Sequence, residues 1–338
     1  MTEGIFPLLG AAFVVLIVLP AFALLAKAGL VLLERDEAGG ILHHLNLRYL
    51  LLTGSSVLPL AWFFSAGLHQ AEGDKSAYAC LFDHEATLCF EPGLFALTLG
   101  LVVVFLSRSV LRGLRGARPA HGAGVHVLAR IEDVLAKHPR LRALRGRVVV
   151  TDEPGFALGT YGWIQPRVFI GVAFAARLSD DMLASALGHE TEHVRSLDPL
   201  RYLLLQFALA VNPFGRFLLE RHAARWYAAR EAHCDREAVI RGALPLPLAD
   251  AIVHAARPTN QQAVALGARD AGVLKFRIGL LLAFAERSPS RCCDRGPSAF
   301  SMSLVLLLLA LLSPHETGTA ALDALHTGAE QALTYLWP

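Results

Sequence analysis

Long apolar runs constrain the fold of this chain more than any other feature. A transmembrane helix needs about 20 consecutive, mostly apolar residues. Residues 5–26, 49–68 and 93–111 meet this requirement, and the shorter run at 299–313 is intensely apolar. The hydrophobic fraction of 54% and the mean hydropathy of +0.46 exclude an ordinary soluble domain. We therefore expect a mainly α-helical polytopic membrane protein with about four transmembrane helices.

The first apolar run has two interpretations. The residues before it, from Met1 to Phe6, include no Lys or Arg, and the run is longer than the apolar core of a secretory signal peptide. Both observations favour a retained helix. The small residues from Ala26 to Ala28 resemble a signal-peptidase site and keep a cleaved leader open as the alternative.

The charged residues between the runs predict the orientation in the membrane. Cytoplasmic loops of membrane proteins are rich in Lys and Arg. The loop at residues 69–92 contains one Lys or Arg, Lys75. Several arginines lie at the end of the third run, after it or before the last run: Arg108, Arg112, Arg115, Arg118, Arg287, Arg291 and Arg295. We expect a bacterial inner-membrane protein whose N-terminus, 69–92 loop and 314–338 tail lie outside. The large region at 112–298 would face the cytoplasm.

The cysteines fit this topology. Cys80 and Cys89 lie in the predicted outer loop, where a disulfide can persist. Such a bridge would add roughly 2–3 kcal/mol of local constraint. Two free thiols are the alternative. The other three cysteines fall on the reducing side and are expected to be thiols: Cys234, Cys292 and Cys293.

The cytoplasmic region begins as a helix and continues as short strands. Residues 126–137 have a helical pattern that ends before His138-Pro139. Three short runs of strand-forming residues follow around turn residues, at 147–151, 156–161 and 167–172. We expect them to form a small antiparallel sheet.

The next helix contains the most informative motif, GHETEH. Ser179 or Asp180 is the expected N-cap, and apolar residues then recur at helical spacing. A helix places residues i and i+4 on one face, so His189 and His193 can bind one metal ion. Glu190 can then act as the general base. This is the HExxH pattern of zinc proteases, so we predict one Zn²⁺ per chain.

A third ligand is needed, and the acidic and histidine residues downstream supply the candidates. The densest cluster is REAHCD at 230–235. Glu231 can bind zinc, while Asp235 accepts the N–H of a ligating histidine. The alternative is that Glu231 forms an ordinary ion pair, for example with Arg230. The full candidate set is Glu220, His222, Glu231, His233, Cys234 and Asp235.

Three segments together resemble one known family. They are HETEHVRSLD at 189–198, Asn-Pro-Phe at 212–214, and REAHCD at 230–235. They resemble the membrane metallopeptidases of the Bla/Mec antirepressor type, which are bacterial polytopic zinc proteases. The similarity extends over roughly residues 125–285 and includes the strand pair before the catalytic helix. It implies a cytoplasmic α+β catalytic domain of the zincin type.

The resemblance also implies roles for individual residues. His189, His193 and Glu231 would be the zinc ligands, and Glu190 the general base. Further residues would support the site or stabilise an oxyanion: Asp198, Asp235 and Arg230 in the first role, and His222 or Arg225 in the second. By analogy, the strand near 167–172 would be a sheet edge that pairs with an extended substrate.

The apolar segment at 199–219 has a consequence for the topology. If this segment crossed the bilayer completely, Glu231 and His189 would lie on opposite sides and no zinc site would form. We therefore expect it to be buried, re-entrant or a hairpin broken at Asn212-Pro213. The catalytic site would then lie at the cytoplasmic surface of the membrane.

These features predict a zinc endopeptidase that cleaves cytoplasmic or membrane-proximal proteins. The family resemblance implies a transcriptional repressor as substrate. A β-lactam receptor role is not expected, because only residues 314–338 follow the last run. A membrane quality-control protease and a catalytically silent scaffold are the alternatives. The net charge of +2 gives no reason to expect nucleic-acid binding, and the pattern leaves the oligomeric state open.

Overall fold

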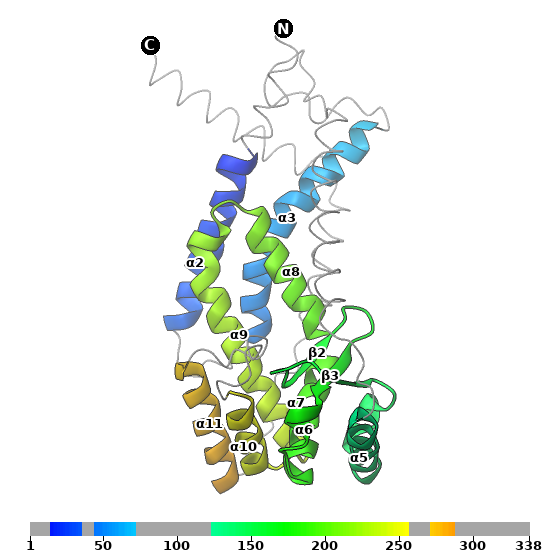
Figure 1. The fold of residues 1–338 in the computed structure, drawn as a ribbon. Coiled ribbons are helices and arrows are strands. Elements are labelled where there is room, and N and C mark those ends of the chain that lie inside the picture. The colour runs from blue at the N-terminus through cyan, green and yellow to red at the C-terminus, as the bar shows by residue number, and fades with distance from the viewer. Residues whose placement is uncertain (1–13, 36–43, 72–122, 257–270, 288–338) are drawn as a thin grey trace, which may run out of the picture.

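The computed structural model describes residues 14–35, 44–71, 123–256 and 271–287. Helices predominate in these residues, and a small sheet accompanies them (Figure 1). The elements in chain order are a π-helical turn at Val14–Val18, α2 (Leu19–Arg35), α3 (Leu45–Ala71), α5 (Ala123–Lys137), a 3₁₀ helix at Pro139–Leu144, β1 (Val148–Thr151), β2 (Leu158–Tyr161), β3 (Arg167–Gly171), α6 (Val172–Ala175), α7 (Asp180–Arg195), α8 (Asp198–Val211), α9 (Gly215–Ile240), α10 (Pro245–Ala255) and α11 (Ala271–Glu286).

One described helix is long and apolar enough to cross a membrane. It comprises Leu16–Arg35 and has a mean hydropathy of 2.4. It lies further along the chain than the expected span at 5–26, and a signal sequence would satisfy the same criteria. The second expected span, 49–68, falls within the longer helix α3. The expected spans at 93–111 and 299–313, the 69–92 loop with Cys80 and Cys89, and the 314–338 tail lie outside the described residues.

The apolar segment at 199–219 forms a helical hairpin. Helix α8 runs beside α3, and α9 returns alongside α8 and packs against α2 and α3 after a turn at Asn212–Phe214 (Figure 1). Asn212 explains the turn, because its Oδ1 accepts from the Phe214 amide at 3.0 Å. Its Nδ2 donates to the Leu19 carbonyl at 2.9 Å and ties the turn to α2. Both ends of the hairpin therefore lie on the same side of this helical layer.

The sheet is mixed, so the expectation of an antiparallel sheet is wrong. The strand order is β1-β3-β2, with β1 parallel and β2 antiparallel to β3. Strand patterns identify the strands but not their order, and β3 lies in the centre. Residues 167–172 therefore do not form the expected sheet edge. In the described sheet the edges are β1 and β2.

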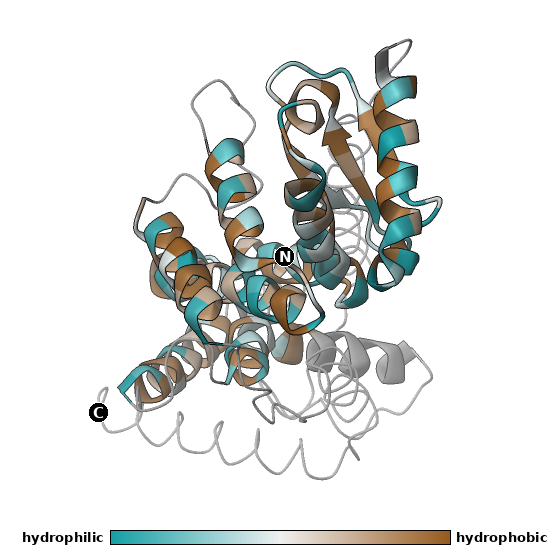
Figure 2. Ribbon diagram, turned by 90° about the horizontal axis from the view of Figure 1, so that it is seen from below, coloured by the Kyte–Doolittle hydropathy of each residue, from teal (hydrophilic) through white to brown (hydrophobic). Residues whose placement is uncertain are grey.

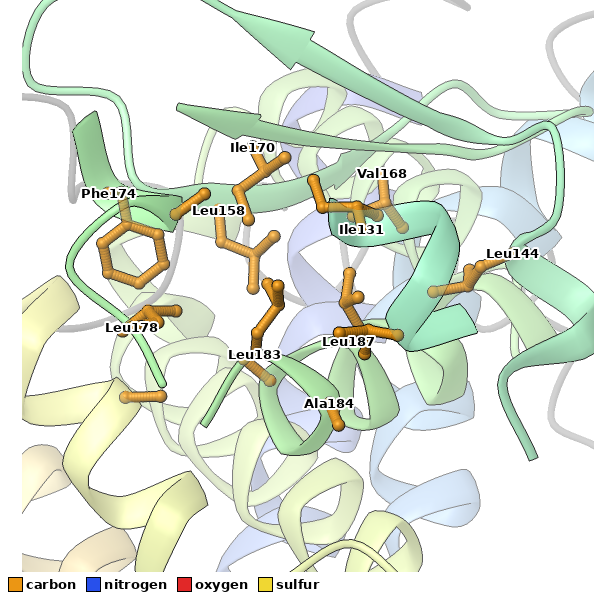
Figure 3. Close-up of a cluster of buried hydrophobic side chains, with 14 of the residues drawn as sticks. Ile131, Leu144, Leu158, Val168, Ile170, Phe174, Leu178, Leu183, Ala184 and Leu187 are labelled. Carbon is orange, nitrogen blue, oxygen red and sulfur yellow. The ribbon is translucent and has the colours of Figure 1, made fainter. Parts of the chain in front are cut away.

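The core below the hairpin is built between the sheet, α5 and α7. Leu183 and Leu187 point from α7 toward the sheet (Figure 3). The core also includes Ile131, Leu158, Val168, Ile170 and Phe174. Seen from below, the strands are mostly hydrophobic, whereas the surrounding helices contain hydrophilic as well as hydrophobic residues (Figure 2). One side of α7 therefore packs against the sheet, and another side packs against α9.

Gly171 at the end of β3 permits a close backbone contact that any side chain would disrupt. A Cβ at this position would lie 2.1 Å from the Phe156 carbonyl oxygen. We expect Gly171→Ala to destabilise the fold by about 1–3 kcal/mol, because overpacking here forces the backbone to move. The matched control is Gly279→Ala in α11, where a Cβ would meet nothing within 4 Å. The control should be neutral or slightly stabilising, since Ala favours a helix by about 1 kcal/mol. Chemical unfolding of both variants measures the difference.

Candidate metal centre

Helix α7 presents both histidines of the HExxH motif to one point. Its N-terminus is capped by Ser179, whose side chain accepts from the Met182 amide at 3.3 Å. One helical turn separates His189 from His193, and their Nε2 atoms lie 3.0 Å apart. Both side chains are buried. The local helical spacing alone therefore produces two of the ligand positions.

Helix α9 supplies the third candidate metal ligand, Glu231. The Oε2 atom of Glu231 lies 3.4 Å from His189 Nε2, and its Oε1 atom lies 3.5 Å from His193 Nε2. One ligand atom from each of the three buried residues lies within 4.8 Å of the others. His189, His193 and Glu231 can therefore hold a metal ion. The hairpin of α8 and α9 brings Glu231 back to α7 and makes this arrangement geometrically possible.

Each histidine has an aspartate at its other ring nitrogen. Nδ1 of His189 lies 2.8 Å from Asp235 Oδ1, and Nδ1 of His193 lies 2.7 Å from Asp198 Oδ2. An acceptor at Nδ1 fixes the tautomer that leaves the Nε2 lone pair for a metal. Asp235 therefore lies beside His189, where the sequence interpretation expected an acceptor, and the contact meets the distance but not the angle of a hydrogen bond. Asp198 lies at Nδ1 of His193 in the same way, and this contact is a hydrogen bond.

Two arginines compensate the charge of these aspartates. Arg230 Nε donates to Asp198 Oδ2 at 2.8 Å. Arg277 of α11 donates to Asp235 from Nε at 2.6 Å and from Nη2 at 2.8 Å. Burial alone would raise the pKa of both aspartates, but Arg230 and Arg277 hold these pKa values well below the usual range. The aspartates are therefore ionised acceptors at neutral pH.

Glu231 is also ionised. Burial raises its pKa, but the neighbouring His193 and Arg277 outweigh burial and lower the pKa to about 2. The hydroxyl of Tyr202 donates to Glu231 Oε1 at 3.3 Å. An ionised carboxylate beside two imidazole nitrogens is the donor set that suits a divalent cation such as zinc.

Glu190 lies next to the first histidine and is 1% exposed. Thr160, on strand β2, donates its hydroxyl to Glu190 Oε2 at 2.6 Å. The other carboxylate oxygen, Oε1, is buried and has no hydrogen-bond partner within the described part of the chain. A buried carboxylate with one oxygen held and the other unoccupied can accept a proton from a bound water.

A second group also satisfies the distance criterion for a metal, but it fits less well. It consists of His193, Asp198 and Cys234. The Cys234 sulfur lies 3.7 Å from both His193 Nδ1 and Asp198 Oδ2. Burial raises the pKa of this thiol, and Arg230 already occupies the Asp198 carboxylate. A thiolate ligand at this position is therefore disfavoured relative to the set with Glu231.

His222 and Arg225, the residues expected to stabilise an oxyanion, both contact Glu34. His222 Nδ1 lies 2.9 Å from Glu34 Oε1, and Arg225 Nη1 donates to Glu34 Oε2. Glu34 belongs to α2, so both residues join α9 to the candidate membrane helix. These contacts give no support to an oxyanion role, because both side chains are engaged by Glu34.

Three residues that contact Glu190 or Glu231 escaped the sequence interpretation: Thr160, Tyr202 and Arg277. Thr160 lies in a strand whose pattern gave no reason to single it out. Arg277 was detectable in principle, because it is a basic residue inside the mostly apolar stretch 273–284. The position of Lys275 in the same stretch made that signal ambiguous.

The comparisons with known proteins add no relative. No family model matches the chain, and no curated protein or solved structure matches it significantly. The resemblance of the motifs to the antirepressor metallopeptidases therefore stays a prediction from the sequence. The positions of the histidines, carboxylates and arginines are the basis for assigning a function.

Proposed function

We propose that the protein is an integral-membrane zinc metalloendopeptidase, with His189, His193 and Glu231 as ligands and Glu190 as general base. The observation that carries the proposal is the convergence of these ligands beside a glutamate with an unoccupied buried oxygen. Two histidines and one glutamate leave a fourth position open, which is the pattern of catalytic rather than structural zinc.

The residues of the chain perform most of the reaction. Zinc, when bound, would polarise the scissile carbonyl and lower the pKa of the attacking water. Glu190 would accept the water proton through Oε1 and donate it to the leaving amine, while Thr160 holds Oε2 in place. Asp235 and Asp198 keep the two imidazoles in the correct tautomer.

The strand that supports Glu190 also suggests how a substrate binds. β2 is an edge of the described sheet, and it contains Thr160. An extended peptide can add to a sheet edge through main-chain hydrogen bonds. The proposed substrate is therefore an extended segment of a protein, and a transcriptional repressor remains the substrate that the sequence motifs suggest. The strand proposed to pair with the substrate is therefore β2, because β3 lies in the centre of the sheet.

The membrane assignment rests on exposed apolar side chains. Leu25 and Leu32 of α2 are 69% and 64% exposed, and Phe217, close to the turn of the α8–α9 hairpin, is 87% exposed. Such residues are stable in contact with lipid and unfavourable in contact with water. We propose a multi-pass bacterial inner-membrane protein with the metal centre at the cytoplasmic face.

Metal removal tests the proposal directly. We expect detergent-purified protein to contain about one zinc per chain and to hydrolyse an unfolded protein probe, such as labelled casein. A chelator should abolish hydrolysis, and added Zn²⁺ but not Mg²⁺ should restore it, because magnesium prefers oxygen ligands. Metal content is measured by atomic emission and hydrolysis by fluorescence. A protein without zinc, or with hydrolysis that persists after zinc removal, would contradict the proposal.

A further inference from the structure

Arg277 is a buried charge on α11, a helix that packs against α9 and α10. Within α11 the buried residues are Arg277 and Leu281, whereas Phe276 and Leu282 are 40% and 49% exposed. Ile278 and Phe284 pack partly against α9 and α10. Among the described residues, the helix therefore packs against α9 and α10 through one face. Arg277 lies on that face and is 3% exposed.

All three guanidinium nitrogens of Arg277 contact carboxylates of the metal centre. Nε and Nη2 form a bidentate pair with Asp235, at 2.6 Å and 2.8 Å. Nη1 lies 3.1 Å from Glu231 Oε2. The planar fork of arginine matches two oxygens at once, which a lysine cannot do. Arg277 thus contacts one proposed zinc ligand directly and contacts the support of another.

Arg277 compensates the negative charge of two buried carboxylates, Glu231 and Asp235. Glu231 and Asp235 are one helical turn apart on α9, and both are buried. Two buried carboxylates repel each other unless a cation compensates them. The ion pairs of Asp235 join it to His189 and Arg277. If Arg277 were absent, the Asp235 and Glu231 carboxylates would lose the guanidinium from α11 that holds both of them in place.

His189 and His193 differ in the helix that supplies the arginine beside their aspartate. Asp198, which supports His193, is compensated by Arg230 of α9 at 2.8 Å, and Arg201 of α8 lies 3.9 Å away. Both arginines belong to the hairpin that builds the centre. Asp235, which supports His189, depends on α11 for its arginine. The His189 side of the centre is therefore complete only when α11 is docked.

We infer that Arg277 is a positioning residue of the zinc centre, through which the docking of α11 sets the affinity of the centre for metal. This inference rests on the proposed function. Arg277 would not touch the zinc or the substrate. It would act by holding the Asp235 and Glu231 carboxylates in place, and release of α11 would weaken the His189 side of the centre.

Zinc affinity measured on the full chain tests this role. The variants are Arg277→Met, Arg277→Lys and the matched control Lys275→Met, which removes an exposed cation from the same helix. Competition with a chromophoric chelator should show zinc affinity reduced about 10- to 100-fold in Arg277→Met, as for other residues that support metal ligands. Arg277→Lys should be intermediate, and Lys275→Met should match the wild type. Cobalt-loaded Arg277→Met should also show an altered visible spectrum, which reports ligand geometry.

The possible outcomes separate this inference from the proposed function. Wild-type zinc affinity and an unchanged cobalt spectrum in Arg277→Met would overturn the inference and leave the zinc protease proposal intact. A wild-type protein without zinc would overturn both. If Arg277→Met does not fold, Arg277→Lys decides, because it keeps the charge and loses the fork. Equal zinc affinity in Arg277→Lys and the wild type would then reject the positioning role.

Discussion

A Glu190→Gln variant is expected to bind zinc as the wild type does and to hydrolyse its substrate about 100- to 10,000-fold more slowly. Glutamine has the shape of glutamate, and its carbonyl oxygen can still accept from the Thr160 hydroxyl. It cannot accept a proton from water. The loss should therefore appear in kcat, with zinc content unchanged, and the rate of peptide cleavage beside the zinc content measures both.

Glu192→Gln is the matched control for this prediction. Glu192 lies on the same helix and is also buried, but it forms ion pairs with Arg195 at 2.7 Å and Arg241 at 3.0 Å. Its carboxylate joins structural elements and has no assigned role in the reaction. The variant should unfold more easily and still hydrolyse substrate. Equal loss of activity in both variants, or full activity in Glu190→Gln, would contradict the assignment of Glu190.

The parts of the site that were predictable from sequence are those encoded by local spacing. The N-cap at Ser179 and the pairing of His189 with His193 follow from positions within one helix. Asp235 was expected at a ligating histidine because it lies one turn after Glu231. A few neighbouring residues determine the cap and the histidine pair, and the structure agrees with both. The contact of Asp235 with His189 also needs α9 to return to α7.

The parts that were missed or wrong depend on contacts between distant segments. The strand pattern gave the positions of β1, β2 and β3, but the order that places β3 in the centre depends on packing against α5 and α7. The partner of His222 and Arg225 is Glu34, in a helix near the other end of the chain. Arg277 reaches the centre from α11, after a segment that the local pattern does not place. Charge pairing across such separations leaves no periodic signal.

The hairpin of α8 and α9 illustrates how chemistry can constrain topology before a structure is available. A zinc site that includes both His189 and Glu231 requires the apolar segment between them to turn back. The structure shows that turn at Asn212–Phe214. The inference succeeded because a metal site requires its ligands to meet, whatever lies between them in the chain.

The variant Glu231→Ala is expected to lose zinc and, with it, all metal-dependent hydrolysis. Glu231 is the ligand that α9 contributes, and its removal leaves the two histidines of α7 alone. Two ligands do not retain catalytic zinc, which takes three protein ligands. The substitution also leaves Arg277 with Asp235 as its remaining acidic partner among the described contacts, so the fold should survive. Metal content per chain, measured beside the wild type, checks the prediction.

Glu220→Ala provides the control, because Glu220 is an exposed carboxylate of the same helix and was one of the alternative third ligands. It should retain both zinc and activity. Zinc that persists in Glu231→Ala would show that the third ligand is another residue, and the group of His193, Asp198 and Cys234 would then be the alternative. Loss of zinc in Glu231→Ala alone would establish that residues before and after the hairpin meet at one metal. In the proposed membrane topology, that result would require α8 and α9 to return to the same side of the bilayer, because a single crossing cannot place both ligands at one ion.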